Sequence, residues 1–221
     1  MDNAKAEYKK KNSDYNDKSF ISYDQGASNS REIQEQCGVG EDRADEIFEG
    51  VNDYTDESRY IKDASHMSED EYLDKYICHD EDDYLVNKAK ADAAEEYILK
   101  SPKFTGELMR GMGLSQEKFD KLMKQVKNKE PITDLGLSSW SQDKEIALEF
   151  SVGGKDKPYR VVHVLKHGTA KGTPITNLSV YDHEQEILIS ASERRIATGK
   201  IEKVKDGDTI VYFIEEEEIF E

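Results

Sequence analysis

Two carboxylates one residue apart begin the stretch of this sequence that is richest in possible chemistry. Glu184 and Glu186 flank Gln185, and the apolar residues Ile187 to Ile189 follow directly. Residues i and i+2 of a β-strand point to the same face, about 6.5–7 Å apart, so we expect both glutamates on one face. Glu186 should lie where solvent meets the core, and burial there should raise its pKa. The alternative is a solvated strand edge with Gln185 turned inward.

A pair of carboxylates in such a place suits chemistry at a sugar carbon. One carboxylate can stabilise an oxocarbenium-like transition state, and the other can orient or deprotonate the attacking group. NAD is itself a glycoside, and its nicotinamide is a cationic leaving group that needs no general acid. An enzyme that cleaves NAD also needs a cation for the pyrophosphate and a clamp for the nicotinamide ribose.

The sequence holds a candidate for each of these two further parts. Arg110 stands at the end of a short predicted strand and is followed by Gly111. Ser139 and Ser141 again lie at i and i+2, directly before a predicted helix. Each has a plainer interpretation, because a lone arginine is usually a surface charge and Ser141 could simply be a helix N-cap.

The order of these motifs resembles that of the arginine-type mono-ADP-ribosyltransferases, which include bacterial toxins and vertebrate ecto-enzymes. The resemblance covers roughly residues 41–214. A tryptophan stands where the family usually has the threonine of Ser-Thr-Ser, and Ile61-Lys62 stands where Ile-Asn is usual. The matching segments are Met109-Arg110-Gly111, Ser139-Trp140-Ser141 with Ala147 and Phe150 after it, and Glu184-Gln185-Glu186.

The resemblance implies how NAD would be bound and cleaved. Arg110 would hold an NAD phosphate, which suits a bidentate guanidinium, with Gly111 beside it. Ser139 would hold the site together near the nicotinamide ribose, and Ser141 would also contribute to NAD binding. Glu186 would be the catalytic carboxylate.

The resemblance also implies how the acceptor would be recognised. Glu184 would act on the acceptor, and a glutamate at this position goes with arginine as the target. Tyr181 lies in the loop that in the family meets the substrate protein. Glu186, Glu184, Ser139 and Arg110 are therefore the expected catalytic residues.

The function implied is that of an NAD-dependent mono-ADP-ribosyltransferase, a glycosyltransferase that moves ADP-ribose from NAD to arginine side chains of a target protein and releases nicotinamide. An NAD glycohydrolase and a non-catalytic binding module on the same fold are the alternatives. Glu184 favours transfer over hydrolysis, and the intact Arg110, Ser139 and Glu186 argue against the binding module. NAD is expected as a substrate, and no metal is expected, because Ile187 replaces the second histidine that a zinc HExxH motif needs.

The charge of the chain limits its partners. The net charge is −17, which argues against binding to nucleic acid or to anionic membranes, because phosphate binding needs a basic surface. Residues 41–83 hold 17 acidic and 4 basic residues, and this acidic half could steer basic proteins towards the site. We expect the target to be a basic protein with an accessible arginine. We expect the enzyme itself to be a monomer.

Helical patterns fill the first half of the chain, and short segments rich in β-branched residues fill the second, which indicates an α+β fold. The resemblance implies an ADP-ribosyltransferase-like fold, in which N-terminal helices pack on two mostly antiparallel sheets around an NAD cleft. Residues 1–37 are polar, and we expect a partly disordered N-terminal extension that contributes little to the site. Residues 38–221 would form the domain.

The first residues of the chain lack the apolar core of a Sec signal peptide, and no apolar run is long enough to span a membrane. We therefore expect a cytoplasmic protein, or a toxin or phage effector. Such an effector would be delivered into a host cell by a phage particle or by another Sec-independent route.

Overall fold

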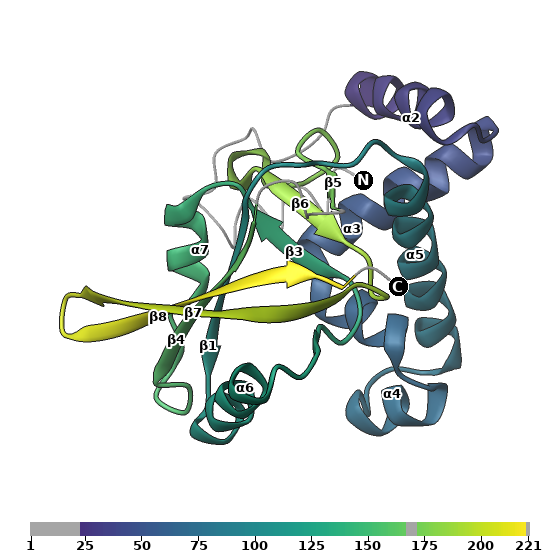
Figure 1. Ribbon diagram of the computed structural model, residues 1–221. Helices are drawn as coiled ribbons and strands as arrows, with labels where there is room; N and C mark the ends of the chain where they lie inside the picture. Colours follow the sequence, from purple (N-terminus) through teal and green to yellow (C-terminus); the bar gives the residue numbers. More distant parts are fainter. Residues whose placement is uncertain (1–22, 167–171, 220–221) are drawn as a thin grey trace.

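The computed structural model describes residues 23–166 and 172–219, and it shows helices in the first half of the chain and strands in the second (Figure 1). The expected α+β fold is confirmed. The helical half contains α2 (Tyr23–Cys37), α3 (Glu41–His66), α4 (Glu69–Lys75) and α5 (Glu81–Lys100). The second half contains β1 (Leu108–Leu114), α6 (Gln116–Asn128), β2 (Ile132–Thr133), β3 (Ser138–Ser141), α7 (Lys144–Phe150), β4 (Tyr159–Leu165), β5 (Thr173–Pro174), the 3-10 turn η2 (Asp182–Glu184), β6 (Glu186–Ile189), β7 (Arg194–Asp206) and β8 (Thr209–Glu218).

Side-chain caps explain where the shorter helices begin. Ser68 and Glu71 form a capping box at α4, and Asp80 and Asp83 form another at α5. Each box satisfies backbone N–H groups that have no partner inside the helix. The chain leaves α5 shortly before Pro102, because the residue that precedes a proline disfavours the helical conformation.

The helices α2, α3 and α5 form one layer, which packs on the end of the sheet that carries β3 and β6 (Figure 1). In α2, the side chains of Ile33 and Cys37 are buried in this shared core, and Ile33 is only 1% exposed. Asn29 also donates a hydrogen bond of 2.8 Å to the carbonyl of Asn177. Residues 23–37 of the expected extension are thus a helix in the core, and residues 1–22 lie outside the described residues.

The eight strands form one hydrogen-bonded sheet in the order β2-β7-β8-β4-β1-β3-β6-β5. Among the described strands, β4 and β8 are the one parallel pair, and all other neighbours are antiparallel. The two sheets expected from the sequence are therefore joined. The strands β1 and β3 are linked only through the pair Met109 and Ser141, so the sheet opens at this junction.

Two further helices fix the strands beside the junction. Helix α6 buries Phe119, Leu122 and Val126 against one group of strands. Helix α7 lies so close to β1 that a Cβ atom on Gly111 would be 1.8 Å from the carbonyl oxygen of Ala147. A glycine at this position lets helix and strand touch, and the junction becomes the floor of a cavity.

Three local expectations from the sequence are wrong. Arg110 lies inside β1 and not at the end of a strand, because pairing with β4 continues to Leu114. Among the segments of the second half that are rich in β-branched residues and were expected as strands, residues 173–178 form a strand of only two residues, because the chain turns after Pro174. Glu184 does not belong to the strand of Glu186, because it lies in the turn η2 and strand β6 begins only at Glu186. In the described part of the chain, every helix is too short or too polar to cross a bilayer.

Candidate active site

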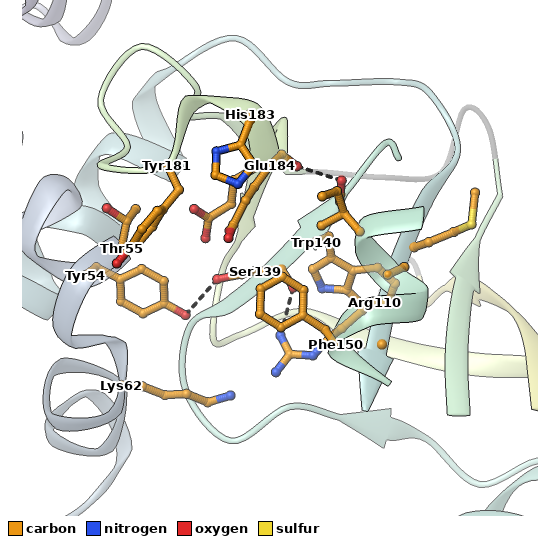
Figure 2. A pocket seen from close by; sticks show the side chains of 16 residues that line it. Tyr54, Thr55, Lys62, Arg110, Ser139, Trp140, Phe150, Tyr181, His183 and Glu184 are labelled. Atoms are coloured by element: carbon orange, nitrogen blue, oxygen red, sulfur yellow. Dashed lines mark hydrogen bonds between the residues drawn. The ribbon is translucent and has the colours of Figure 1, made fainter. Parts of the chain in front are cut away.

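A cavity of about 490 Å³ opens where the helical layer, the sheet junction and the loop before β6 meet. All of the residues proposed from the sequence line it (Figure 2). Side chains from α3 and α7 line the same cavity. The lining consists of Tyr54, Thr55, Lys62, Met109, Arg110, Gly111, Ser139, Trp140, Ser141, Ile146, Ala147, Phe150, Tyr181, His183, Glu184 and Glu186.

Arg110 reaches the cavity from β1 and is held by the neighbouring strand. Its Nη1 donates a hydrogen bond of 3.2 Å to the carbonyl oxygen of Ser139 (Figure 2). One bond to a neutral carbonyl leaves most of the five N–H donors of the guanidinium able to bind a ligand.

The two serines of the short strand β3, Ser139 and Ser141, form hydrogen bonds with different parts of the site. The hydroxyl of Ser139 lies 3.4 Å from the hydroxyl of Tyr54 on α3 (Figure 2). The hydroxyl of Ser141 donates to the carbonyl oxygen of Glu184 at 2.7 Å. Ser141 is not the N-cap of α7, because Asp143 caps that helix and accepts from the N–H of Glu145 at 2.8 Å. The two serines therefore tie the loop and α3 to the strand.

Trp140, between the two serines, is 2% exposed and packs in the core. Its indole N–H donates to the hydroxyl of Ser138 at 3.0 Å. The guanidinium of Arg195 lies 4.9 Å from the centre of the indole ring, a distance at which a cation and an aromatic face attract each other. A hydrogen bond and buried packing thus anchor the strand between the two serines.

The two glutamates reach the cavity from a turn and from a strand, not from one strand. Glu184 ends the 3-10 turn η2, and Gln185 has a left-handed backbone with φ of 46°. Strand β6 begins only at Glu186, which pairs with Ser141. Gln185 is exposed, so the alternative with Gln185 turned inward is also wrong. The left-handed backbone of Gln185 allows both carboxyl groups to reach the cavity. An i, i+2 strand pattern does not reveal such a turn.

The environment of Glu186 differs from that of an ordinary surface glutamate. It is 5% exposed, and burial raises its pKa to about 7. A hydrogen bond from Ser139 opposes the rise, and the charge of Glu184 adds to it. Ser179 also donates to Glu186 Oε2, at 3.5 Å. Burial raises the pKa of Glu184 as well. Both carboxyl groups are thus prepared to interact with a positive charge.

The comparison with curated proteins finds similarity to one whose name states the expected chemistry. No protein-family model matches the chain. A Mycobacterium avium (strain 104) protein named as an NAD(+)–arginine ADP-ribosyltransferase, Mav, is 26% identical over 131 residues. These residues are 59% of this chain and 14% of the relative. The chain therefore spans about one seventh of that relative's length.

The solved structures that resemble this fold decide the architecture. The Vis toxin of Vibrio splendidus, an ADP-ribosyltransferase, matches with a TM-score of 0.59 at 18% identity, over 90% of this chain and 87% of the toxin. Plx2a, an ADP-ribosyltransferase toxin of Paenibacillus larvae, matches with a TM-score of 0.54 at 14% identity, over 88% and 93% of the two chains. This chain has the ADP-ribosyltransferase fold. The fold expected from the motifs is confirmed.

Within the ADP-ribosyltransferase fold, the cavity includes residues that the motifs did not point to. The side chains of Tyr54, Thr55 and Lys62 come from α3, and His183 comes from η2. Thr55 accepts a hydrogen bond of 2.9 Å from the N–H of Val180, so α3 also holds the loop that leads to Tyr181. The part of α3 with Ile61-Lys62 belonged to the resemblance, but no spacing rule connects it to Ser139 and Glu186, which lie more than 70 positions further along the chain.

The described residues contain no group of three or more histidine, cysteine, aspartate or glutamate side chains that could hold a metal ion. The cavity is instead divided by charge. Tyr181, His183 and Glu184 lie on one side of Ser139, whereas Lys62 and the guanidinium of Arg110 lie on the other (Figure 2). The residues predicted to act together do share one cavity, and their roles remain predictions.

Proposed function

We propose that this protein is an NAD-dependent mono-ADP-ribosyltransferase that transfers ADP-ribose to arginine side chains of a target protein and releases nicotinamide. The observation that carries the proposal is the meeting of Glu186 and Glu184 with Arg110 and Ser139 in one cavity. The similarity to Mav and the shared fold with Vis support the same activity. NAD would enter as a substrate that is consumed.

The first half of the reaction breaks the bond between the nicotinamide nitrogen and C1′ of the ribose. The bonding electrons leave with nicotinamide, which becomes neutral, and the positive charge passes to the ribose as an oxocarbenium. Glu186 faces this charge as a carboxylate, with Ser139 and Ser179 holding its oxygens. Its raised pKa fits this role, because a cationic ligand in a buried site favours the ionised carboxylate.

The second half forms a bond between C1′ and a nitrogen of the acceptor arginine. A guanidinium stays protonated at neutral pH and is a poor nucleophile, so the proton that it loses needs an acceptor. Glu184 is placed for this, because it lies in the turn at the cavity and its raised pKa makes it a better base than an ordinary glutamate. Vis has been crystallised with agmatine, a small guanidinium compound.

The partner of this reaction would be a protein with an accessible arginine. The strongly acidic residues 41–83 form α3, α4 and the start of α5 beside the cavity. They favour a basic target by electrostatic steering. An effector or toxin that acts inside another cell is the biological setting that we propose, in keeping with the toxins that share the fold.

The proposal is tested by measuring nicotinamide release and arginine labelling side by side, with NAD as donor and agmatine or lysate protein as acceptor. Glu186→Gln should lower both activities by roughly 10²–10³-fold or more, because it removes the charge facing the oxocarbenium. Glu184→Gln should abolish labelling and keep hydrolysis, since water needs less help at a reactive oxocarbenium. Glu35→Gln, an exposed glutamate on α2, is the matched control.

The alternatives have their own signatures in this experiment. Release of nicotinamide without labelling of any acceptor by the wild-type protein would favour an NAD glycohydrolase. No release at all would favour a binding module. Equal loss of both activities in Glu184→Gln would contradict the division of labour between the two glutamates.

A further inference from the structure

The loop that leads to Tyr181 is fixed by hydrogen bonds at five consecutive residues, which we call the acceptor loop (residues 177–181). Part of this network lies within the loop, because the hydroxyl of Ser179 accepts from the N–H of Tyr181 at 3.0 Å and donates to Glu186 Oε2 at 3.5 Å. Figure 2 shows Tyr181 reaching from this loop towards α3, where Thr55 lies. Every residue of the acceptor loop thus has at least one fixed polar group.

The remaining contacts come from side chains of two helices. Asn29 lies on α2, and Asn52 and Thr55 lie one turn apart on α3. The hydroxyl of Thr55 donates its own proton to the carbonyl oxygen of Asn52 at 2.7 Å, which leaves its lone pairs available to the loop. Backbone groups outside helices and strands depend on such side-chain partners. The three bonds are those from Asn29 to the carbonyl oxygen of Asn177 (2.8 Å), from Asn52 to the carbonyl oxygen of Leu178 (2.8 Å), and from the N–H of Val180 to Thr55 (2.9 Å).

Helix α2 contacts the acceptor loop although no described residue of α2 lines the cavity. Asn29 is 6% exposed, so its amide is buried where it meets the loop. Ile33, one turn further along α2, belongs to the same buried cluster as Leu178 of the loop. A hydrogen bond and apolar packing therefore link this helix to a loop that lies 148 positions away in the sequence.

The position of the acceptor loop matters more for one outcome of the proposed reaction than for the other. In both outcomes, nicotinamide leaves with the bonding electrons. In transfer, C1′ then bonds a guanidine nitrogen, whose proton passes to Glu184; in hydrolysis, C1′ bonds the oxygen of a water, whose proton passes to solvent. Transfer requires the guanidinium to lie between C1′ and Glu184, and a misplacement of about 1 Å can slow a reaction by roughly 10²-fold. A small, mobile water molecule has no such requirement.

We propose that Asn29, Asn52 and Thr55 are positioning residues that decide how much ADP-ribose is transferred to arginine and how much is lost to water. The assignment rests on the proposed function. The three side chains act through the acceptor loop, which they hold so that Tyr181 and Glu184 meet the acceptor. Helix α2 thereby belongs to the part of the protein that controls transfer.

The first test measures agmatine labelling and total nicotinamide release for variants that each lose one hydrogen bond at similar side-chain size. Asn29→Leu, Asn52→Leu and Thr55→Val should each lower the ratio of labelling to release roughly 2- to 10-fold, the usual net worth of one hydrogen bond. The loss should appear in kcat/KM for agmatine and much less in KM for NAD. Thr55→Ser keeps the hydroxyl and should restore the wild-type ratio. Gln36→Leu is the matched control, because this amide of α2 bonds Glu32 and not the loop.

Hydrogen exchange of the Val180 amide, measured by mass spectrometry on the whole chain, tests the same contacts without any catalysis. This N–H is bonded to Thr55 in the wild type, so Thr55→Val should speed its exchange by a similar factor, and Thr55→Ser should not. Asn29→Leu should speed it as well, because a loop released at Asn177 opens more often.

Unchanged exchange at Val180 in Thr55→Val would show that α3 does not hold the acceptor loop and would overturn the proposal. A wild-type ratio of labelling to release in all three variants would also overturn it, because the contacts would then serve the fold alone. A wild-type protein that releases no nicotinamide would refute the proposed function and the positioning role with it, so the two failures are distinguishable.

Discussion

Replacing Glu186 should make the protein more stable at alkaline pH while it destroys the activity. Glu186 is 5% exposed, and burial raises its pKa from 4.5 to about 7. A carboxyl group with a raised pKa costs the folded state nothing below pH 4.5, where it is protonated in both states. The cost grows as the pH rises from 4.5 to 7 and is complete above pH 7.

The magnitude follows from the pKa values. One pKa unit corresponds to about 1.4 kcal/mol, so ionised Glu186 destabilises the folded state by roughly 3 kcal/mol above pH 7. Glutamine has the same size and no charge, so Glu186→Gln should recover most of this free energy at pH 8 and almost none at pH 4.5. For a chain of 221 residues, the gain corresponds to a rise in Tm of roughly 6–12 °C.

The assay is urea unfolding of wild-type and Glu186→Gln protein at pH 4.5, 6 and 8, with Glu35→Gln as a control that should change little at any pH. Equal gains at pH 4.5 and pH 8 would show that the effect is not due to the charge. No gain at pH 8 would refute the reasoning that burial makes this carboxylate costly. A gain would show that the fold sacrifices stability to keep the carboxylate in the cavity.

Three further predictions concern the pH profile and the packing of the site. Nicotinamide release, measured as kcat/KM, should rise about tenfold between pH 6 and its plateau at higher pH, because Glu186, whose pKa burial raises to about 7, must be ionised. Gly111→Ala should destabilise the protein by at least about 2 kcal/mol in urea unfolding, because its Cβ would lie 1.8 Å from the carbonyl oxygen of Ala147; a stable variant would show that α7 can move away. Trp140→Phe should lower the free energy of unfolding by roughly 1–3 kcal/mol. It removes the indole hydrogen bond to Ser138 and weakens the stacking on Arg195. A melting temperature equal to that of the wild type, measured by circular dichroism, would contradict the anchoring role.

Tertiary contacts bring residues to the site that the motifs did not identify. The three motifs identified Arg110, Ser139 and Glu186, because their residue types and order carry the chemistry. Lys62 was noted only as a departure from the Ile-Asn pattern, since its position beside Arg110 depends on how α3 packs against the sheet. The sequence did not show the role of α2, because this helix is mostly polar and contributes only two apolar side chains, Ile33 and Cys37, to the described core.

The sequence by itself determined the α+β class, the Ser68 cap of α4 and the buried face of α6, since these depend on side chains that are near neighbours along the chain. Only the tertiary structure decided how the carboxylates meet. The left-handed backbone at Gln185 places Glu184 in a turn and Glu186 in a strand, a conformation that residue types alone do not specify. The raised pKa of Glu186 could be expected in direction, but its size results from burial by α3, β3 and the loop of Ser179, which lie far apart in the sequence and come together only on folding.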